Sequence, residues 1–139
     1  MCGIIGIFNN EKACTLVDLG LNSISYRGVD GQGFSDGKFV SKKNNIKGEN
    51  AVAHCLHAVV GFVEQPLKGE KSILVANSEI YNWKNLSEKY KLKSKNDSEL
   101  LLQLLDNYHL DKVEELDGDY SVAYWKEDVV YLFRDIIGV

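Results

Sequence analysis

Residues 1–8 read Met1-Cys2-Gly3-Ile4-Ile5-Gly6-Ile7-Phe8, a thiol one methionine from the N-terminus followed at once by an apolar, glycine-containing stretch. The stretch predicts a β-strand over residues 3–8. If Met1 is removed, the α-amino group of Cys2 itself can accept the thiol proton, since the ordinary pKa of such a group is about 7.7–8.0. Cys2 is therefore a candidate nucleophile, although a small buried side chain at a strand start has the same appearance in a sequence.

The composition is that of one ordinary globular domain. The 139 residues are long enough for a proper hydrophobic core and leave no room for a second domain of any size. An apolar fraction of 45% and a charged fraction of 26% exclude disordered, collagen-like and coiled-coil classes. The net charge of −4, with no basic cluster, argues against a nucleic-acid partner. Because the apolar runs are too short to span a bilayer, no membrane partner is expected either.

The cysteines and the N-terminus indicate a reducing compartment. Cys2, Cys14 and Cys55 leave one thiol unpaired in any disulfide scheme, and their spacing is not that of a zinc site. Residues 1–8 carry no basic residue ahead of the apolar stretch, unlike a secretory signal. We therefore expect reduced thiols, no metal and a cytoplasmic location.

The first half of the chain alternates between a strand, a helix and turns. Apolar residues at helical spacing predict a helix over residues 13–24. Three glycines over residues 26–33 indicate a turn, and Asp36-Gly37 predicts a hairpin over residues 34–40. The polar residues 41–50 are expected to form a surface loop.

The second half adds strands around another helix. Strands are predicted over residues 51–60, 72–76, 120–125 and 129–133, with a loop at residues 64–67. Asn96 and Glu99 have the spacing of a capping box and precede an amphipathic helix that reaches Tyr108. Antiparallel strands separated by helices favour a layered α+β fold over a parallel, doubly wound one.

Several short motifs follow one another along the chain. They read Met1-Cys2-Gly3-Ile4-Ile5-Gly6, Arg27-Gly28-Val29-Asp30-Gly31-Gln32-Gly33, Asn77-Ser78-Glu79-Ile80-Tyr81-Asn82, Asn96-Asp97-Ser98-Glu99 and Arg134-Asp135-Ile136-Ile137-Gly138. In this order they resemble the class II glutamine amidotransferases, and most of all the glutaminase domain of the asparagine synthetase type. The resemblance covers essentially residues 1–139. It implies the N-terminal-nucleophile hydrolase fold, a four-layer αββα sandwich of two antiparallel sheets between helices.

The resemblance also implies roles for single residues. Cys2 would attack the side-chain amide of glutamine and form a thioester, with its own α-amine as the general base. The side-chain amide of Asn77 and the backbone N–H of Ser78 would stabilise the oxyanion. Asp97 would bind the α-ammonium group of the substrate, although an acidic residue is also favoured in a first helical turn without any function.

The remaining candidates complete the expected site. Glu79 is expected to orient its loop, Arg27 to shape the pocket floor and contact the substrate, and Val60 to line the substrate site. His54 and His57 are not taken as acid or base. An N-terminal cysteine needs no separate histidine, and both residues lie in a predicted apolar strand where core packing explains them.

Two positions depart from the family pattern. Leu56 stands where the family has an arginine that clamps the α-carboxylate of glutamine, and Ser78 replaces a glycine. The only arginines, Arg27 and Arg134, belong to other motifs. Because the chain stops within its last motif, either it is a fragment or the domain is shortened before its last strands, and we expect no synthetase domain within residues 1–139.

Three hypotheses about function remain open from the sequence. The leading one is a glutamine-hydrolysing domain that passes ammonia to an ATP-dependent, asparagine-synthetase-like domain or subunit and needs no cofactor. The rival is a non-catalytic domain of the same fold that binds a ligand or a subunit. A third is hydrolysis of another amide that lacks an α-carboxylate. A homodimer is one option for its assembly.

Overall fold

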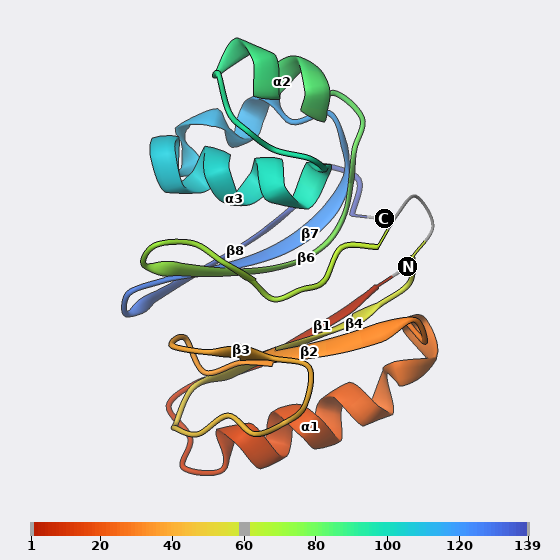
Figure 1. Ribbon diagram of the computed structural model, residues 1–139, viewed down its shortest axis with the longest axis vertical. Helices are drawn as coiled ribbons and strands as arrows, with labels where there is room; N and C mark the ends of the chain where they lie inside the picture. The colour runs from red at the N-terminus through yellow and green to blue at the C-terminus, as the bar shows by residue number, and fades with distance from the viewer. Residues whose placement is uncertain (1, 59–61, 139) are drawn as a thin grey trace.

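Two antiparallel sheets lie face to face in the computed structural model, which describes residues 2–58 and 62–138 (Figure 1). The first sheet contains β1 (Gly3–Ile7), β2 (Gly31–Ser35), β3 (Val40–Ser41) and β4 (Ala51–Leu56), in the order β1-β4-β2-β3. The second contains β5 (Leu67–Lys68), β6 (Ser72–Ile80), β7 (Gly118–Lys126) and β8 (Val129–Arg134), in the order β5-β6-β7-β8.

Helices cover the outer face of each sheet. The helix α1 (Ala13–Ser23) lies on the first sheet, and α2 (Trp83–Lys89) and α3 (Asp97–Tyr108) lie on the second (Figure 1). Short 3-10 helices follow α1 and α3, as η1 (Ser25–Arg27) and η2 (His109–Glu115). The predicted α+β fold, with its four αββα layers, is confirmed.

Local sequence signals explain both long helices. In α1 the residues Ala13, Val17 and Leu21 face the first sheet and are buried, as their spacing predicted. At the start of α3 the Asn96 side chain accepts from the Glu99 N–H at 2.8 Å. The Glu99 carboxylate accepts from the N–H of Lys95, one residue before the cap, at 2.9 Å. The predicted cap is therefore present, with the glutamate reaching one residue further back than in the usual box.

Side chains alternate between two buried layers along β4. Ala51, Ala53 and Cys55 pack towards α1, whereas Val52 packs against Ile73 of β6 in the layer between the sheets. Adjacent residues of this strand therefore belong to different cores, as the two-residue period of a strand requires. All six side chains of β4 are buried, so the strand is central to the whole sandwich.

Several predicted boundaries were wrong. The register of β6 with β7 continues from Ser72 to Ile80, so residues 77–79 lie inside a strand and do not follow it. The strand β2 begins at Gly31, within the predicted turn, because residues 31–35 pair with β4. Pairing of β4 stops at Leu56, and the predicted strand end at residues 59 and 60 lies outside the described residues.

Other elements agree better with the sequence. The hairpin at Asp36-Gly37 is confirmed, with Gly37 at a φ of 88° in the left-handed region that favours glycine. The β7–β8 hairpin is confirmed and longer than predicted. The helix α2 was not predicted. In the polar stretch 41–50, Ile46 is buried against the core beneath α1 and anchors that loop.

The side chain of Gln65 completes the open edge of β6. Its Oε1 accepts from the Ala76 N–H at 2.7 Å, and its Nε2 donates to the Ala76 carbonyl at 3.0 Å. Because β5 pairs only with residues 73 and 74, the amide of Gln65 takes the place of a neighbouring strand at this point. The sequence had suggested no more than a loop here.

Replacement of Gln65 by alanine is expected to destabilise the protein. Gln65→Ala leaves two buried backbone groups of Ala76 without partners, so the free energy of unfolding should fall by about 2–4 kcal/mol in urea denaturation. Gln32→Ala removes an exposed glutamine side chain of the first sheet and should change it by less than about 0.5 kcal/mol. Equal losses in the two variants would contradict the role assigned to Gln65.

Candidate active site

Three separate segments hold Cys2, which is half-buried at the start of β1. Its N–H donates to Asn77 Oδ1 at 2.9 Å, and its carbonyl accepts from Arg27 Nε at 3.2 Å. Its Sγ accepts from the backbone N–H of His57 at 3.3 Å. The main chain of Cys2 is therefore held from the second sheet and from η1, and its sulfur contacts the main chain of His57 just beyond β4.

Asn77 projects from β6 into the layer between the sheets. Its Oδ1 accepts from Cys2, and this bond fixes the orientation of the amide because a reversed group would set two donors against each other. The Nδ2 group is therefore turned away from Cys2 N. The amide of Asn77 thus combines an acceptor for the main chain of Cys2 with two donor hydrogens on its other arm.

The backbone N–H of Ser78 points to the open edge of β6. Alternate residues of an antiparallel strand direct their N–H groups to the same side. The N–H groups of Ala76 and Ile80 both point away from β7, the first bound by Gln65 and the second by Asp97 Oδ2 at 3.2 Å. Ser78 lies midway between them. In the described part of the chain no strand pairs with Ser78 at this edge.

Asp97 joins the start of α3 to the same edge of β6. Its Oδ2 accepts from the Ser78 hydroxyl at 3.1 Å and from Ile80 N–H, while its Oδ1 accepts from Ser98 N–H at 2.8 Å. The Ser98 hydroxyl lies 3.4 Å from Oδ1. The carboxylate thus lies next to Ser78 with both oxygens hydrogen-bonded to the protein.

The other candidates differ in position. Arg27 is half-buried and supports the main chain of Cys2. Glu79 lies exposed within β6, opposite Asp119, and not in a loop as the sequence had suggested. Val60 lies outside the described residues. His57 was missed as a backbone donor, because nothing in a sequence shows where a main-chain N–H points.

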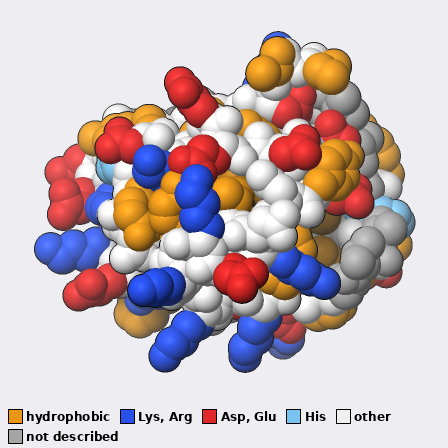
Figure 2. All heavy atoms as spheres, turned by 90° about the horizontal axis from the view of Figure 1, so that it is seen from above, with side chains coloured by type: hydrophobic (Ala, Val, Ile, Leu, Met, Phe, Trp, Pro, Cys, Tyr) orange, Lys and Arg blue, Asp and Glu red, His pale blue; other side chains and the backbone are white. Residues whose placement is uncertain are grey.

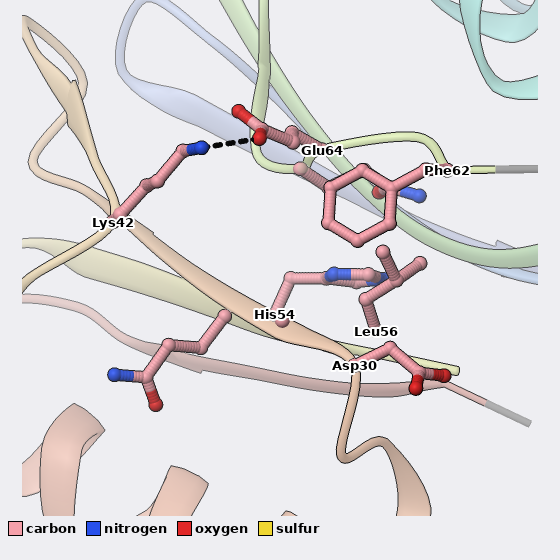
Figure 3. A pocket seen from close by; sticks show the side chains of 9 residues that line it. Asp30, Lys42, His54, Leu56, Phe62 and Glu64 are labelled. Carbon is pink, nitrogen blue, oxygen red and sulfur yellow. Dashed lines mark ion pairs between the residues drawn. The ribbon is translucent and has the colours of Figure 1, made fainter. Parts of the chain in front are cut away.

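A cavity of about 210 Å³ lies beside Leu56 (Figure 3). It is lined by Asp30, Gly31, Gln32, Lys42, His54, Leu56, Phe62, Glu64 and Gln65. Lys42 and Glu64 form an ion pair across its mouth, and the ring of Phe62 lies over Leu56 and His54 (Figure 3). Cys2 is not among the residues that line this cavity.

The two histidines near the site have opposite environments. His54 is fully buried, and neither ring nitrogen has a hydrogen-bond partner among the described residues. Burial disfavours the charged ring and lowers the pKa of His54 to about 4. The nearby Ala76 carbonyl favours the charged ring and so opposes part of this shift, although it forms no hydrogen bond to the ring. The interpretation of His54 as a core residue fits this position. For His57 it was wrong, because that side chain lies beyond the end of β4 and is 46% exposed.

The surface, the helices and the metal-ligating side chains add three observations. Acidic and basic side chains are interspersed on the face shown in Figure 2. Within residues 2–58 and 62–138, no helix is long and apolar enough to cross a membrane. In the same ranges no three His, Cys, Asp or Glu side chains are grouped so that they could hold a metal ion.

A family model described as a glutamine amidotransferase domain matches residues 1–139. The chain belongs to this family. It is 33% identical to a putative glutamine-hydrolysing asparagine synthetase of Methanocaldococcus jannaschii and 30% identical to glutamine-hydrolysing asparagine synthetase 2 of Bacillus subtilis. Both alignments cover 100% of the chain, but only 29% and 19% of those proteins. The amidotransferase domain thus spans less than a third of the length of these two relatives.

Solved structures support the fold. The glutamine phosphoribosylpyrophosphate amidotransferase of B. subtilis superposes with a TM-score of 0.80 at 22% identity, over 99% of this chain and 38% of that one. A structure titled as the allosteric regulatory enzyme of purine biosynthesis gives a TM-score of 0.78 at 21% identity, over 97% of this chain and 37% of that one. The N-terminal-nucleophile fold expected from the motifs is therefore confirmed for this amidotransferase domain.

The buried histidine makes the stability of the domain depend on pH. The pKa of His54 is about 4 in the folded state against an ordinary 6.5, so the unfolded chain binds the proton first. The stabilisation is fully present above about pH 6.5 and is lost as the pH falls towards 4. Between pH 7 and pH 4.5 the parent should lose about 2–3 kcal/mol more unfolding free energy than His54→Gln.

Urea denaturation at the two pH values measures this difference. His109→Asn provides the control, since His109 is exposed and asparagine tolerates its φ of 55°. The control should follow the parent. If His54→Gln lost as much stability as the parent on acidification, the neutral state assigned to His54 would be wrong.

Proposed function

We propose that Cys2 of this domain hydrolyses glutamine and that the ammonia is passed to an ATP-dependent synthetase domain or subunit of the asparagine synthetase type. The observation that carries the proposal is the hydrogen bond from Cys2 N to Asn77 Oδ1 at 2.9 Å, beside the uncovered N–H of Ser78. In this proposal Cys2 supplies the nucleophile and its base, and Asn77 and Ser78 supply the two oxyanion donors.

Removal of Met1 is the first requirement. It converts the Cys2 N–H into an α-amine that Asn77 Oδ1 still accepts from and that lies on the same residue as the thiol. The amine takes the thiol proton, and the thiolate attacks the amide carbon of glutamine. The proton then goes to the departing nitrogen, which leaves as ammonia. Water cleaves the thioester, releases glutamate and restores the thiol.

Two donors serve the oxyanion that forms during attack. Asn77 Nδ2 is turned away from Cys2 N, and Ser78 N–H points to the open edge between two satisfied neighbours. Each donor of this kind contributes about 3–4 kcal/mol to transition-state stabilisation in enzymes where one has been removed. Arg27 acts indirectly, because it holds the carbonyl of Cys2.

Asp97 is the proposed site for the α-ammonium group of glutamine. Its carboxylate lies at the edge of β6, bonded to the Ser78 hydroxyl and the Ile80 N–H. The hydroxyls of Ser78 and Ser98 already contact it, so binding requires one of them to rotate away. We include Val60 and Glu79 as substrate-site residues on the family pattern alone.

The synthetase partner is supported by the relatives. Two of them carry asparagine synthetase and glutamine-hydrolysing in their names, and this chain matches less than a third of each. We take residues 1–139 as one amidotransferase domain and place the protein in the cytoplasm, in keeping with its three free cysteines. The homodimer stays a prediction from the sequence.

Replacement of Cys2 should abolish ammonia release from glutamine without unfolding the protein. Cys2→Ala removes the nucleophile. Cys14→Ala removes a thiol of α1 that contacts the Gly48 carbonyl, and Cys55→Ala one in the core beneath α1, so both should keep activity within about threefold. Intact-mass spectrometry before and after 6-diazo-5-oxo-norleucine should show loss of Met1 and one adduct on Cys2. A retained or blocked N-terminus on every molecule would falsify the proposed base.

Leu56→Arg tests the substrate. The cavity beside Leu56 has room for a longer side chain and carries the carboxylates of Asp30 and Glu64. If glutamine is the substrate, the added guanidinium should lower KM with little change in kcat, as expected for restored ground-state binding. Leu56→Met, an uncharged change of similar volume, should leave KM unchanged. Ammonia release from none of these proteins, at any glutamine concentration, would favour the non-catalytic rival.

A further inference from the structure

Asp30 contacts the end of β4 in two ways. Its N–H donates to the carbonyl of Leu56 at 3.0 Å, and its Oδ2 accepts from the N–H of Ala58 at 2.8 Å. His57 lies between these two anchor points. One residue of the turn before β2 therefore fixes both neighbours of the residue whose N–H contacts the thiol.

The main chain of His57 directs two polar groups at Cys2. The N–H lies 3.3 Å from Sγ, and the carbonyl accepts from the thiol at 3.8 Å. An N–H directed at a sulfur stabilises its anion, and the thiolate is the reactive form of cysteine. Because β4 has ended at Leu56, no strand ladder holds this N–H in place.

We propose that Asp30 is a positioning residue for Cys2: it holds residues 56–58 so that the His57 N–H is directed at the sulfur. The inference rests on the proposal that Cys2 is the nucleophile. It makes Asp30 act through the backbone, without contact to substrate. The imidazole of His57, whose Nδ1 lies 3.7 Å from Asp30 Oδ2, adds an ion pair to the same carboxylate when it is protonated.

The other charged groups around this corner are already engaged. Arg27 binds the Cys2 carbonyl, and Lys42 is paired with Glu64 across the cavity that Asp30 also lines. His54 is neutral at pH 7 because burial lowers its pKa to about 4. The hydrogen bond from the Ala58 N–H to Asp30 is therefore the contact through which Asp30 acts on the main chain beside the thiol.

Alkylation of the thiols by iodoacetamide tests the proposal in the full protein. Peptide mass spectrometry follows Cys2 and Cys14 separately between about pH 6 and pH 9, a range that covers ordinary thiol titration. Asp30→Ala removes the acceptor of the Ala58 N–H, so the His57 N–H is no longer held towards the sulfur and the thiolate of Cys2 loses a hydrogen bond. The alkylation rate of Cys2 should therefore fall about tenfold at pH 7. Cys14, which contacts the carbonyl of Gly48 far from Asp30, should react as in the parent and report an intact fold.

Two further variants separate the hydrogen bond from other effects. Asp30→Asn keeps the oxygen acceptor for Ala58 and should retain most of the reactivity of Cys2. Asp36→Ala is the matched control, because Asp36 also holds a loop of the first sheet through the N–H groups of Lys38 and Phe39, both at 2.9 Å. It should leave the reactivity of Cys2 unchanged. If Asp30→Ala does not fold, Asp30→Ser, too short to reach Ala58, takes its place.

Three results would overturn the proposal. They are an unchanged Cys2 rate in Asp30→Ala, an equal fall in Cys2 and Cys14, and an Asp30→Asn variant as slow as Asp30→Ala. Alkylation does not require glutamine turnover, so the two proposals can fail separately. A parent protein that releases no ammonia but shows the predicted loss in Asp30→Ala refutes the glutaminase alone. Ammonia release with an unchanged Cys2 profile in Asp30→Ala refutes the positioning role alone.

Discussion

The hydrogen bond from Cys2 N–H to Asn77 Oδ1 joins a residue at the start of the first sheet to one in the middle of the second. Its length of 2.9 Å requires the two sheets to keep a fixed separation at this point. The layer between them supplies that separation, with Val52 packed on Ile73 and Val75 and with the ring of Phe8 edge-on to Trp125 at 5.2 Å between centroids. A change of the core there would move the thiol relative to the oxyanion donors, although none of these side chains is close to the chemistry.

A second constraint comes from the edge of β6. Buried or partly buried backbone groups need partners. Beyond the pairing with β5, two of the three N–H groups on this edge of β6 have one. Gln65 satisfies Ala76, and Asp97 satisfies Ile80. Ser78 lies between them without a covering strand in the described residues. The Ser78 N–H, the proposed oxyanion donor, thus lies between two N–H groups that the protein already binds. The Ser78 side chain does not block this edge, because its hydroxyl is turned towards α3 and donates to Asp97.

Much of the fold could be predicted because its signals are local. The apolar face of α1, the Asn96 cap and the hairpin at Asp36-Gly37 each depend on residues close together in the chain. The end of β6 could not be predicted, since its polar residues 77–79 read as a turn and only pairing with β7 makes them a strand.

The candidate site shows the same division. The order of the motifs made Cys2, Asn77, Ser78 and Asp97 the candidates from the sequence alone. Their geometry depends on contacts between distant segments that no motif describes. Gln65 reaches Ala76 from a loop, and His57 N–H reaches the thiol from the end of another strand. Backbone directions of this kind follow from the fold and leave no trace in residue types.

The charges around Leu56 explain why the fold tolerates an apolar residue where the family pattern has a cation. Lys42 is paired with Glu64, His54 is neutral at pH 7, and Asp30 is bound to Ala58 N–H. Each charged side chain of the cavity wall therefore has a partner without a guanidinium at position 56, although the wall keeps one carboxylate more than it has cations. Among the described residues that line the cavity, the one lysine is already paired and so no cation is left for an α-carboxylate. Under the proposed function, recognition of glutamine depends on Asp97 and the oxyanion donors, at the amine and amide ends of the substrate and not at its carboxylate.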